Sequence, residues 1–278
     1  MGLIPQAIDS PRTTNHFGVQ KHFDTAGIRL AIVQTEDPGK DLDWHCHENP
    51  HLTFILRGHV IEGTRKQVYH CSPGELLFHS RFEPHYNSKL AGSATCLHID
   101  FDQQYLDDFS PQRNNKLEGV VSIRNSGIKF SCYKLIRETM ISDDFSAASI
   151  QGLSWQVLGQ LISSEQAGRT LRPRWVNRLE EMLQEEYSEK LSLDELSGKL
   201  NIHPVHLSRS FSRYFQCTLG EYVRNIRVER SLALMSRRNI SLTEIATACG
   251  FADQSHFTRS FKQKMGVTPS TYRKLFSQ

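Results

Sequence analysis

Apolar residues recur at helical spacing toward the C-terminal end of the chain, in two similar stretches. The first stretch has Leu193, Leu196 and Leu200, followed by Leu207, Phe211 and Phe215. The second has Leu242, Ile245 and Cys249, followed by Phe257, Phe261 and Met265. Spacings of three and four residues place such side chains on one face of a helix. Each stretch is therefore predicted to form a short helix and a longer one.

The two stretches also match residue by residue. Ser-Leu-Asp-Glu-Leu, which begins at Ser192, returns as Ser-Leu-Thr-Glu-Ile at Ser241, a shift of 49 positions, and the match resumes farther on at a shift of 50. A repeat of this length indicates a duplicated supersecondary unit. In each copy the serine and the glutamate three positions later, Glu195 or Glu244, fit the capping box that begins a helix.

Asn201 and Gly250 occupy equivalent places between the short and the longer helix. Both residue types tolerate a left-handed backbone, which a tight turn between helices requires. Two helix-turn-helix units are therefore predicted. A helix over Leu219–Ser236, with Thr218 and Glu221 at its start, is predicted to join them. At 1.5 Å per residue it would be about 27 Å long, close to the ~34 Å of one DNA turn.

Short apolar runs bounded by Gly and Pro turns fill the region between Ile28 and Asp102, and no helical pattern interrupts them. This pattern favours a small antiparallel barrel or jelly roll. The predicted strands are Ile28–Gln34, Leu52–Leu56, His59–Glu62, Val68–Cys71, Glu75–His79 and Thr95–Asp100.

Between these strands and the repeat, helical spacing returns around Cys132–Met140 and Ile150–Leu161. The expected fold class is therefore α+β in two domains, a barrel with helices followed by an all-α domain. The predicted organisation is an N-terminal arm at 1–25, a sensor and dimerisation domain at 26–165, a linker at 166–173 and a DNA-binding domain at 174–278.

Charge separates the two parts of the chain. Residues 196–278 contain 13 Lys and Arg against four Asp and Glu, a formal charge of +9, whereas the whole chain carries +3. The first 195 residues therefore carry −6. A basic segment confined to the repeat is the electrostatic signature of nucleic-acid binding. A helical repeat that packs only on itself or on a partner protein does not account for this charge.

Length and composition fit this organisation. A chain of 278 residues suits two domains, and its apolar runs are shorter than the ~18–20 residues that span a bilayer. The first residues lack the basic start and long apolar core of a secretory signal. The six cysteines show no paired CxxC spacing, which favours reduced thiols and a cytoplasmic location.

The second copy carries a more specific pattern. It reads Ile245-Ala246, Cys249-Gly250-Phe251, Ser255-His256-Phe257-Thr258-Arg259-Ser260-Phe261-Lys262 and Gly266-Val267-Thr268-Pro269-Ser270-Thr271-Tyr272-Arg273. Over about residues 174–275 the chain resembles the DNA-binding domain of the AraC/XylS family of transcriptional activators. The resemblance implies a sequence-specific regulator of promoter DNA that works with RNA polymerase and forms a homodimer. Its dimer contacts would come from the helices that precede the linker, although these helices could equally well only pack on the barrel.

In a helix-turn-helix, the second helix enters the major groove with its early residues. The resemblance implies base contacts by Val205, Ser208 and Arg209 in the first copy, and by Gln254, Ser255 and Arg259 in the second. His256 and Thr258 lie on the same predicted face. Arg suits paired contacts with guanine, and Gln with adenine. Arg213 and Lys262, farther along the helices, are expected to contact phosphates.

Histidines are concentrated in the predicted barrel, where eight of the 13 lie between residues 45 and 98. The group His45-Cys46-His47-Glu48-Asn49-Pro50-His51, with Pro84-His85-Tyr86-Asn87, resembles the two motifs of the cupin barrel. His45, His47 and His85 match the histidine positions of metal-binding cupins, whereas His51 stands where a glutamate is expected. Residues 45 and 47 of one strand point to the same face. With His51 and His85 they would form a four-nitrogen site suited to a divalent transition metal.

Other interpretations of this cluster remain open. Sensor domains of the family often keep the cupin fold while they bind a small-molecule effector, and their histidines then have no metal. His59, His70, His79 and His98 are expected to fill the barrel or lie on its surface. The predicted function is a DNA-binding activator, not an enzyme, controlled by a ligand or metal in the barrel. The alternative is a cupin-type metalloenzyme, a dioxygenase or isomerase, fused to a DNA-binding domain.

Overall fold

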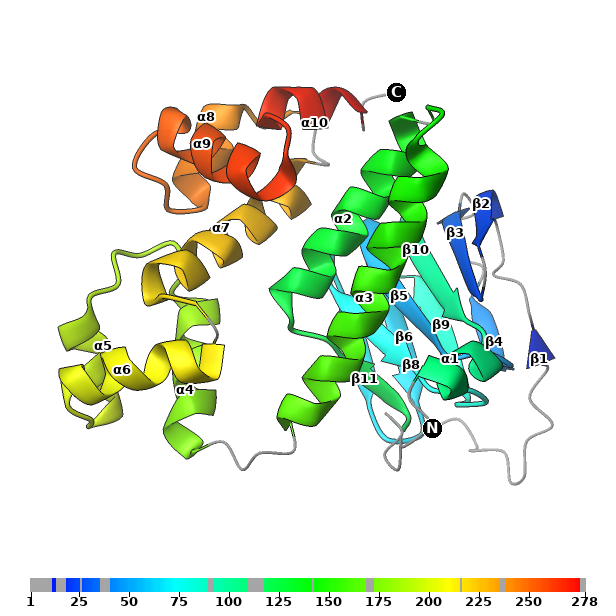
Figure 1. Ribbon diagram of the computed structural model, residues 1–278, viewed down its shortest axis with the longest axis horizontal. Coiled ribbons are helices and arrows are strands. Elements are labelled where there is room, and N and C mark those ends of the chain that lie inside the picture. Colours follow the sequence, from blue (N-terminus) through cyan, green and yellow to red (C-terminus); the bar gives the residue numbers. More distant parts are fainter. Residues whose placement is uncertain are drawn as a thin grey trace. The chain divides into compact units, whose positions relative to one another are not determined.

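The computed structural model describes residues 12–13, 19–25, 27–35, 41–89, 93–109, 118–141, 143–168, 173–215, 217–235 and 239–275. By its contacts the chain divides into two compact units, residues 1–124 and 125–278. The described strands lie in the first unit, and the second is built of helices (Figure 1). The prediction of largely antiparallel sheets followed by helices is confirmed.

The first unit contains two sheets. One has the strand order β1-β4-β9-β6-β7, formed by β1 (Arg12–Thr13), β4 (Leu42–His47), β9 (His85–Lys89), β6 (Val60–Thr64) and β7 (Val68–Cys71). Its pairs are antiparallel except for β1 with β4, which is parallel. In the β4–β9 pair His45 lies opposite His85. The register therefore brings together two histidines that are 40 residues apart in the chain.

The other sheet has the order β11-β8-β5-β10-β3-β2 and is antiparallel throughout. Its strands are β11 (Val120–Ser122), β8 (Leu76–His79), β5 (His51–Arg57), β10 (Ala94–Phe101), β3 (Ile28–Thr35) and β2 (Val19–Thr25), and α1 (Gln103–Phe109) follows β10. β5 lies inside the sheet and is buried from His51 to Leu56. Because side chains alternate along a strand, Leu52 and Phe54 face one side, and His51 and Thr53 face the other.

The six strands predicted from apolar runs correspond to β3, β5, β6, β7, β8 and β10, and their ends agree within two residues. Strands β1, β2, β9 and β11 were not predicted, and β4 was predicted only as the strand that carries residues 45 and 47. Strands β2 and β9 contain few apolar residues, as His-Tyr-Asn-Ser-Lys in β9 shows, and β11 is only three residues long. Such segments become strands because neighbouring strands supply hydrogen-bond partners, a property that local pattern does not carry.

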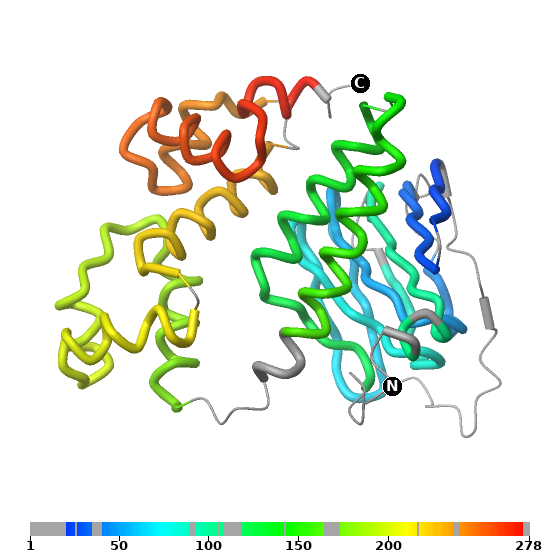
Figure 2. The backbone as a smooth tube through the Cα atoms, in the orientation of Figure 1, coloured from blue at the N-terminus to red at the C-terminus, as the bar shows by residue number. Residues whose placement is uncertain are grey.

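The second unit consists of nine helices within the described residues. They are α2 (Ser126–Ile141), α3 (Ser146–Gly168), α4 (Arg174–Glu185), α5 (Leu193–Leu200), α6 (Pro204–Phe215), α7 (Leu219–Met235), α8 (Leu242–Ala248), α9 (Gln254–Met265) and α10 (Pro269–Leu275). Figure 2 follows the backbone through them from green to red. Leu196, Leu207 and Phe211 share a buried core with α4 and α7. Phe257, Phe261 and Met265 of α9 are likewise buried completely.

The predicted helix starts are confirmed. Ser192 and Ser241 form full capping boxes with the glutamates three residues later. Thr218 and Glu221 exchange hydrogen bonds at the start of α7 in the same way. The two turn residues are also as predicted, since Asn201 has φ 53° and Gly250 has φ 75°.

The domain boundaries at 26–165, 166–173 and 174–278 stay a prediction. By contacts, α2 and α3 belong with the C-terminal helices. Residues 1–11 and 14–18 of the predicted arm, and 169–172 of the predicted linker, lie outside the described residues, while residues 19–25 form β2.

Two further predictions concern membranes and thiols. No helix among the described residues has the length and apolar character needed to cross a membrane. All six cysteines are within the described part of the chain, and none of them forms a disulfide.

Candidate functional site

The two faces of α6 differ in composition. Leu207 and Phe211 are buried against the core of α4, α5 and α7. The predicted DNA-contacting residues are all exposed: Val205, Ser208, Arg209 and Arg213. Val205 is 49% exposed, although an apolar side chain gains from burial. An exposed face with two arginines and an apolar residue suits contact with phosphates, guanine and a thymine methyl.

Helix α9 repeats this arrangement. Its predicted contact residues are exposed at Gln254, Ser255, Arg259 and Lys262, and half-buried at His256 and Thr258. The Gln254 side-chain oxygen accepts a hydrogen bond of 2.6 Å from the Thr243 hydroxyl of α8, which holds this amide in place. The His256 ring meets Phe251 edge to face, with ring centres 5.4 Å apart. His256 therefore contributes to packing as well as to the exposed face.

A buried carboxylate joins α2 to α7. Glu229 is 5% exposed, and its Oε1 lies 2.7 Å from Lys129 Nζ. Ser126 donates a hydrogen bond of 2.9 Å to its Oε2. Farther along α2, Arg137 Nη1 donates to the backbone carbonyl of Met265 at the end of α9, where helix carbonyls lack partners. Helix α2 thus contacts both the helix that joins the two pairs and a helix predicted to read DNA.

The predicted histidine pocket is a cavity of about 70 Å³ in the first unit. It is lined by residues of both sheets: Val33, Leu42, His45, His47, His51, Thr53, Val60, Glu62, His85, Asn87, Ala94, Cys96 and His98. A buried water needs roughly 10–15 Å³ of such space, whereas pockets for small organic ligands are roughly 300–1,000 Å³. The cavity therefore has room for an ion and a few waters.

The structure brings the four predicted histidines together. His45, His47, His51 and His85 are each at most 7% exposed. Ring centres are 4.3 Å apart for His45 and His85, and 4.5 Å apart for His47 and His51. One ring nitrogen each from His45, His47 and His85 lie within 4.8 Å of one another. Three imidazole nitrogens at this spacing can coordinate one metal ion.

Backbone carbonyls orient two of these rings. His45 Nδ1 is 2.7 Å from the carbonyl oxygen of Asp43, and His85 Nδ1 is 2.9 Å from that of Glu83. A carbonyl oxygen only accepts hydrogen bonds, so Nδ1 carries the proton and Nε2 keeps its lone pair. The same arrangement supports metal-bound histidines, because it sets both ring orientation and tautomer.

Sequence reasoning missed His79, which was expected to be filler or surface. His79 is 1% exposed, and its ring stacks on His51 with centres 4.2 Å apart. Nitrogens of His51, His79 and His85 form a second group within 4.8 Å. His98, expected in the same class, lines the cavity, while His59 and His70 are exposed. The missing signal was strand pairing, which places His79 opposite His51.

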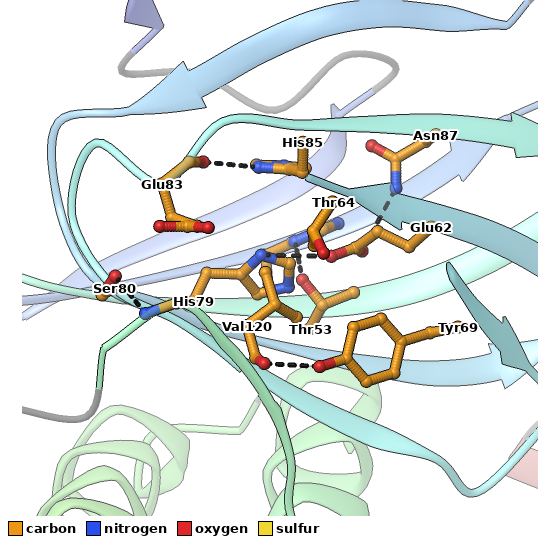
Figure 3. A network of polar contacts seen from close by, with 12 residues as sticks. Thr53, Glu62, Thr64, Tyr69, His79, Ser80, Glu83, His85, Asn87 and Val120 are labelled. Atoms are coloured by element: carbon orange, nitrogen blue, oxygen red, sulfur yellow. Dashed lines mark hydrogen bonds and ion pairs between the residues drawn. The ribbon is translucent and has the colours of Figure 1, made fainter. Parts of the chain in front are cut away.

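Glu62 was also missed, and its carboxyl group lines the cavity. Asn87 donates a hydrogen bond of 3.2 Å to Glu62 Oε2, and His79 Nδ1 lies 3.3 Å from Glu62 Oε1 (Figure 3). Burial raises the pKa of Glu62 to about 8, and the Asn87 bond offsets part of this rise. The sequence offered one signal for this role of Glu62, which was an acidic side chain within the predicted strand His59–Glu62.

The raised pKa of Glu62 predicts a pH-dependent stability. Between pH 4.5 and about 8 the folded protein keeps a proton on Glu62 that the unfolded chain has released. The contribution of protonated Glu62 to the free energy of unfolding is therefore complete below pH 4.5, and it is lost as the pH rises through about 8. The free energy of unfolding should fall by up to about 1.4 kcal/mol per pH unit in this window.

Denaturant unfolding of metal-free protein at pH 5 and pH 7.5 measures this slope. Glu62→Gln should flatten it, because the variant has no group to titrate at this position. Glu48→Gln removes an exposed carboxyl and should leave the slope as it is. An equal slope in Glu62→Gln and the parent protein would contradict the assignment.

Residues 196–275 match the family model of a helix-turn-helix domain. YpdC, an uncharacterized HTH-type transcriptional regulator of Escherichia coli K12, is 32% identical over 94 residues, which are 34% of this chain and 33% of that protein. PqrA, a probable transcription factor of Proteus vulgaris, is 35% identical over 86 residues, which are 31% of this chain and 70% of that protein. The match to YpdC thus spans about a third of its length.

Among solved structures, an apo variant of ToxT from Vibrio cholerae strain SCE256 is similar with 13% identity and a TM-score of 0.41, over 91% of this chain and 99% of that one. Both curated relatives are named as regulators of transcription. These names agree with the prediction of a DNA-binding transcriptional regulator.

Proposed function

The chain belongs to the AraC-type family of helix-turn-helix transcriptional regulators, and on this premise we propose that it activates transcription in response to a signal held in its N-terminal cavity. The observation that carries the proposal is the division of faces on α6 and α9. Each helix buries its apolar side chains and exposes the residues predicted to contact DNA. Together with the charge of +9 over residues 196–278, this arrangement favours DNA as the partner.

We propose that α5–α6 and α8–α9 act as two helix-turn-helix units on neighbouring major grooves. Helix α7 joins them and contacts α6, α8 and α9. Its 17 residues give a length of about 26 Å, near the ~34 Å between equivalent positions one DNA turn apart. Arg209 and Arg259 would then read guanine, and Gln254 would read adenine, each in its own groove.

The proposed signal is a divalent transition metal ion in the cavity of a cupin-like barrel. Nε2 of His45 and of His85, with a nitrogen of His47, would hold the ion. His51, whose ring centre is 4.5 Å from that of His47, would add a fourth nitrogen. Imidazole ligands suit zinc, copper, iron and nickel. The 70 Å³ volume favours an ion over a sugar-sized effector, which remains the alternative signal.

The partners proposed with this function are promoter DNA, RNA polymerase and a second copy of the chain, all in the cytoplasm. Helices α2 and α3 are the proposed dimer contacts. Because α2 holds Glu229 of α7 and the end of α9, a change in α2 would reach the DNA-binding helices directly. This connection is the proposed route from signal to DNA.

Selection of genomic fragments by the purified full-length chain, with and without added Zn²⁺, Ni²⁺ or Cu²⁺, tests the proposal. Enrichment of specific fragments that changes with one of these metals supports it. No enrichment under any condition would contradict DNA reading. Enrichment that no metal alters would leave DNA reading in place and overturn metal control.

Lys262→Ala separates phosphate contacts from base contacts. An exposed lysine on α9 that neutralises one phosphate releases about one counterion, so its loss should weaken specific and random duplexes alike. The slope of log affinity against log salt should become shallower by roughly 0.9. Fluorescence anisotropy titrations at four salt concentrations measure this slope. An unchanged slope, or weakening of the specific duplex alone, would contradict the assignment.

A further inference from the structure

The turn between α8 and α9 lies directly on the connection between α4 and α5. A Cβ added at Gly250 would lie 2.3 Å from the backbone oxygen of Ser188 and 2.6 Å from its Cα. Backbone atoms at such distances cannot yield as a flexible side chain would. The second helix pair therefore touches the segment that leads into the first pair.

The equivalent turn of the first pair shows that backbone conformation alone does not require glycine here. Asn201 adopts φ 53° at that position and is exposed, so a side chain is accommodated. Gly250 has φ 75°, which asparagine also tolerates. The difference between the two turns is the Ser188 backbone against Gly250. Glycine at 250 is thus explained by close approach between segments.

Helix α7 contacts the same connection through Arg227. Arg227 Nε donates a hydrogen bond of 2.7 Å to the Tyr187 carbonyl, and its Nη2 donates one of 2.8 Å to the Glu189 carbonyl. These carbonyls flank Ser188. One turn later, the Arg230 guanidinium lies 5.5 Å from the centre of the Tyr187 ring. Residues 187–189, between α4 and α5, therefore contact both α7 and the α8–α9 turn.

Two connections therefore link the helix pairs: helix α7, and the contact between Gly250 and Ser188. A single helix between two modules allows them to twist and bend relative to each other about its ends. A second connection, in which Gly250 contacts Ser188 and Arg227 binds the carbonyls on either side of it, restricts this twisting and bending. We propose that Arg227 and Gly250 are positioning residues that fix the spacing between α6 and α9, and so determine which spacing of half-sites the chain accepts. This inference rests on the proposed function of both helices as readers of DNA.

Two DNA-reading helices held at a fixed separation bind DNA differently from two that move freely relative to each other. When the two readers are held at one separation, the second half-site is bound with high effective concentration only at the matching spacing. One added base pair moves a half-site by about 3.4 Å and rotates it by about a tenth of a turn. Two helices that move freely adapt to a changed spacing of the half-sites, but they lose part of the affinity gained by binding both half-sites together.

The test uses full-length chain on a fragment obtained by genomic selection, with its two half-sites located by footprinting. Duplexes with zero to three base pairs added or removed between the half-sites give a spacing profile. Gly250→Asn adds the clashing Cβ but keeps a residue that tolerates positive φ. Arg227→Lys keeps the charge and removes the paired hydrogen bonds. Asn201→Gly in the first pair is the matched control, and thermal melting monitors folding of each variant.

Wild type and Asn201→Gly should lose about tenfold or more in affinity for each added base pair, whereas Gly250→Asn and Arg227→Lys should bind all spacings within about threefold. Both variants should bind single half-sites as wild type does, because the DNA-contacting faces are unchanged. If a folded variant depends on half-site spacing as steeply as wild type does, the proposal is overturned. If Gly250→Asn does not fold, the result for Arg227→Lys decides. A wild-type chain that selects no DNA would instead overturn the proposed function.

Discussion

If the proposed metal site is correct, the double variant His45→Ala, His47→Ala is expected to bind no metal and to show no metal-dependent change in DNA binding. Both rings are buried at the cavity, and with His85 they make up the group whose nitrogens lie within 4.8 Å. Removal of two of three nitrogens leaves no complete ligand set. Even loss of a hydrogen-bond partner outside a metal's ligands typically costs 10–100-fold in affinity, so loss of two ligands should exceed about a hundredfold.

Metal content of chain purified without an affinity tag, measured by plasma mass spectrometry, is the readout. The matched control is His59→Ala, His70→Ala, which removes two exposed histidines from the same unit. Metal retained by the double variant would exclude His45 and His47 as ligands. Absence of metal from the parent chain, even after incubation with each candidate ion, would exclude the metal site altogether.

Arg259→Ala is expected to weaken specific DNA binding by about 1–3 kcal/mol, or roughly 5–150-fold, while random duplexes are affected far less. The guanidinium is exposed on α9, one turn beyond the exposed Gln254 and Ser255. A paired contact with guanine carries sequence information, whereas a contact with phosphate does not. The expected change is therefore in the ratio of the two affinities.

Competition titrations of a selected genomic duplex against a shuffled one measure that ratio. Lys262→Ala, on the same helix, provides the control in which both affinities fall and their ratio stays constant. Arg259→Lys keeps the charge but loses the paired geometry, so it should resemble Arg259→Ala in the ratio. An unchanged ratio in Arg259→Ala would show that this residue does not read sequence.

The C-terminal half of the fold could be predicted closely because its signals are local. A capping box depends only on a serine and the glutamate three positions later. The structure contains both predicted capping boxes, at Ser192 and at Ser241. Positive φ at Asn201 and Gly250 follows from the residue types that a tight turn permits. Helix bounds followed from apolar spacing for the same reason. The exposed faces of α6 and α9 were then the complement of the buried ones.

The cavity could be predicted only in part. His45 and His47 share a strand face, which alternation alone shows. Glu62 lines the same cavity from β6, and His79 of β8 stacks on His51 beside it. No local pattern relates either strand to β4. Polar strands such as β9 were missed for the same reason. The raised pKa of Glu62 arises from burial, which is a property of the assembled sheets.

The sequence by itself determined the two helix pairs, their caps and turns, the basic charge of the C-terminal part and the residues that face outward on α6 and α9. These features depend on residues within a few turns of one another, and local chemistry specifies them. Only the tertiary structure decided that polar side chains from both sheets line one small cavity. It also decided that Gly250 lies against Ser188 while Arg227 donates hydrogen bonds to the carbonyls on either side of Ser188. Contacts between distant segments depend on strand register and helix packing, which many residues set jointly.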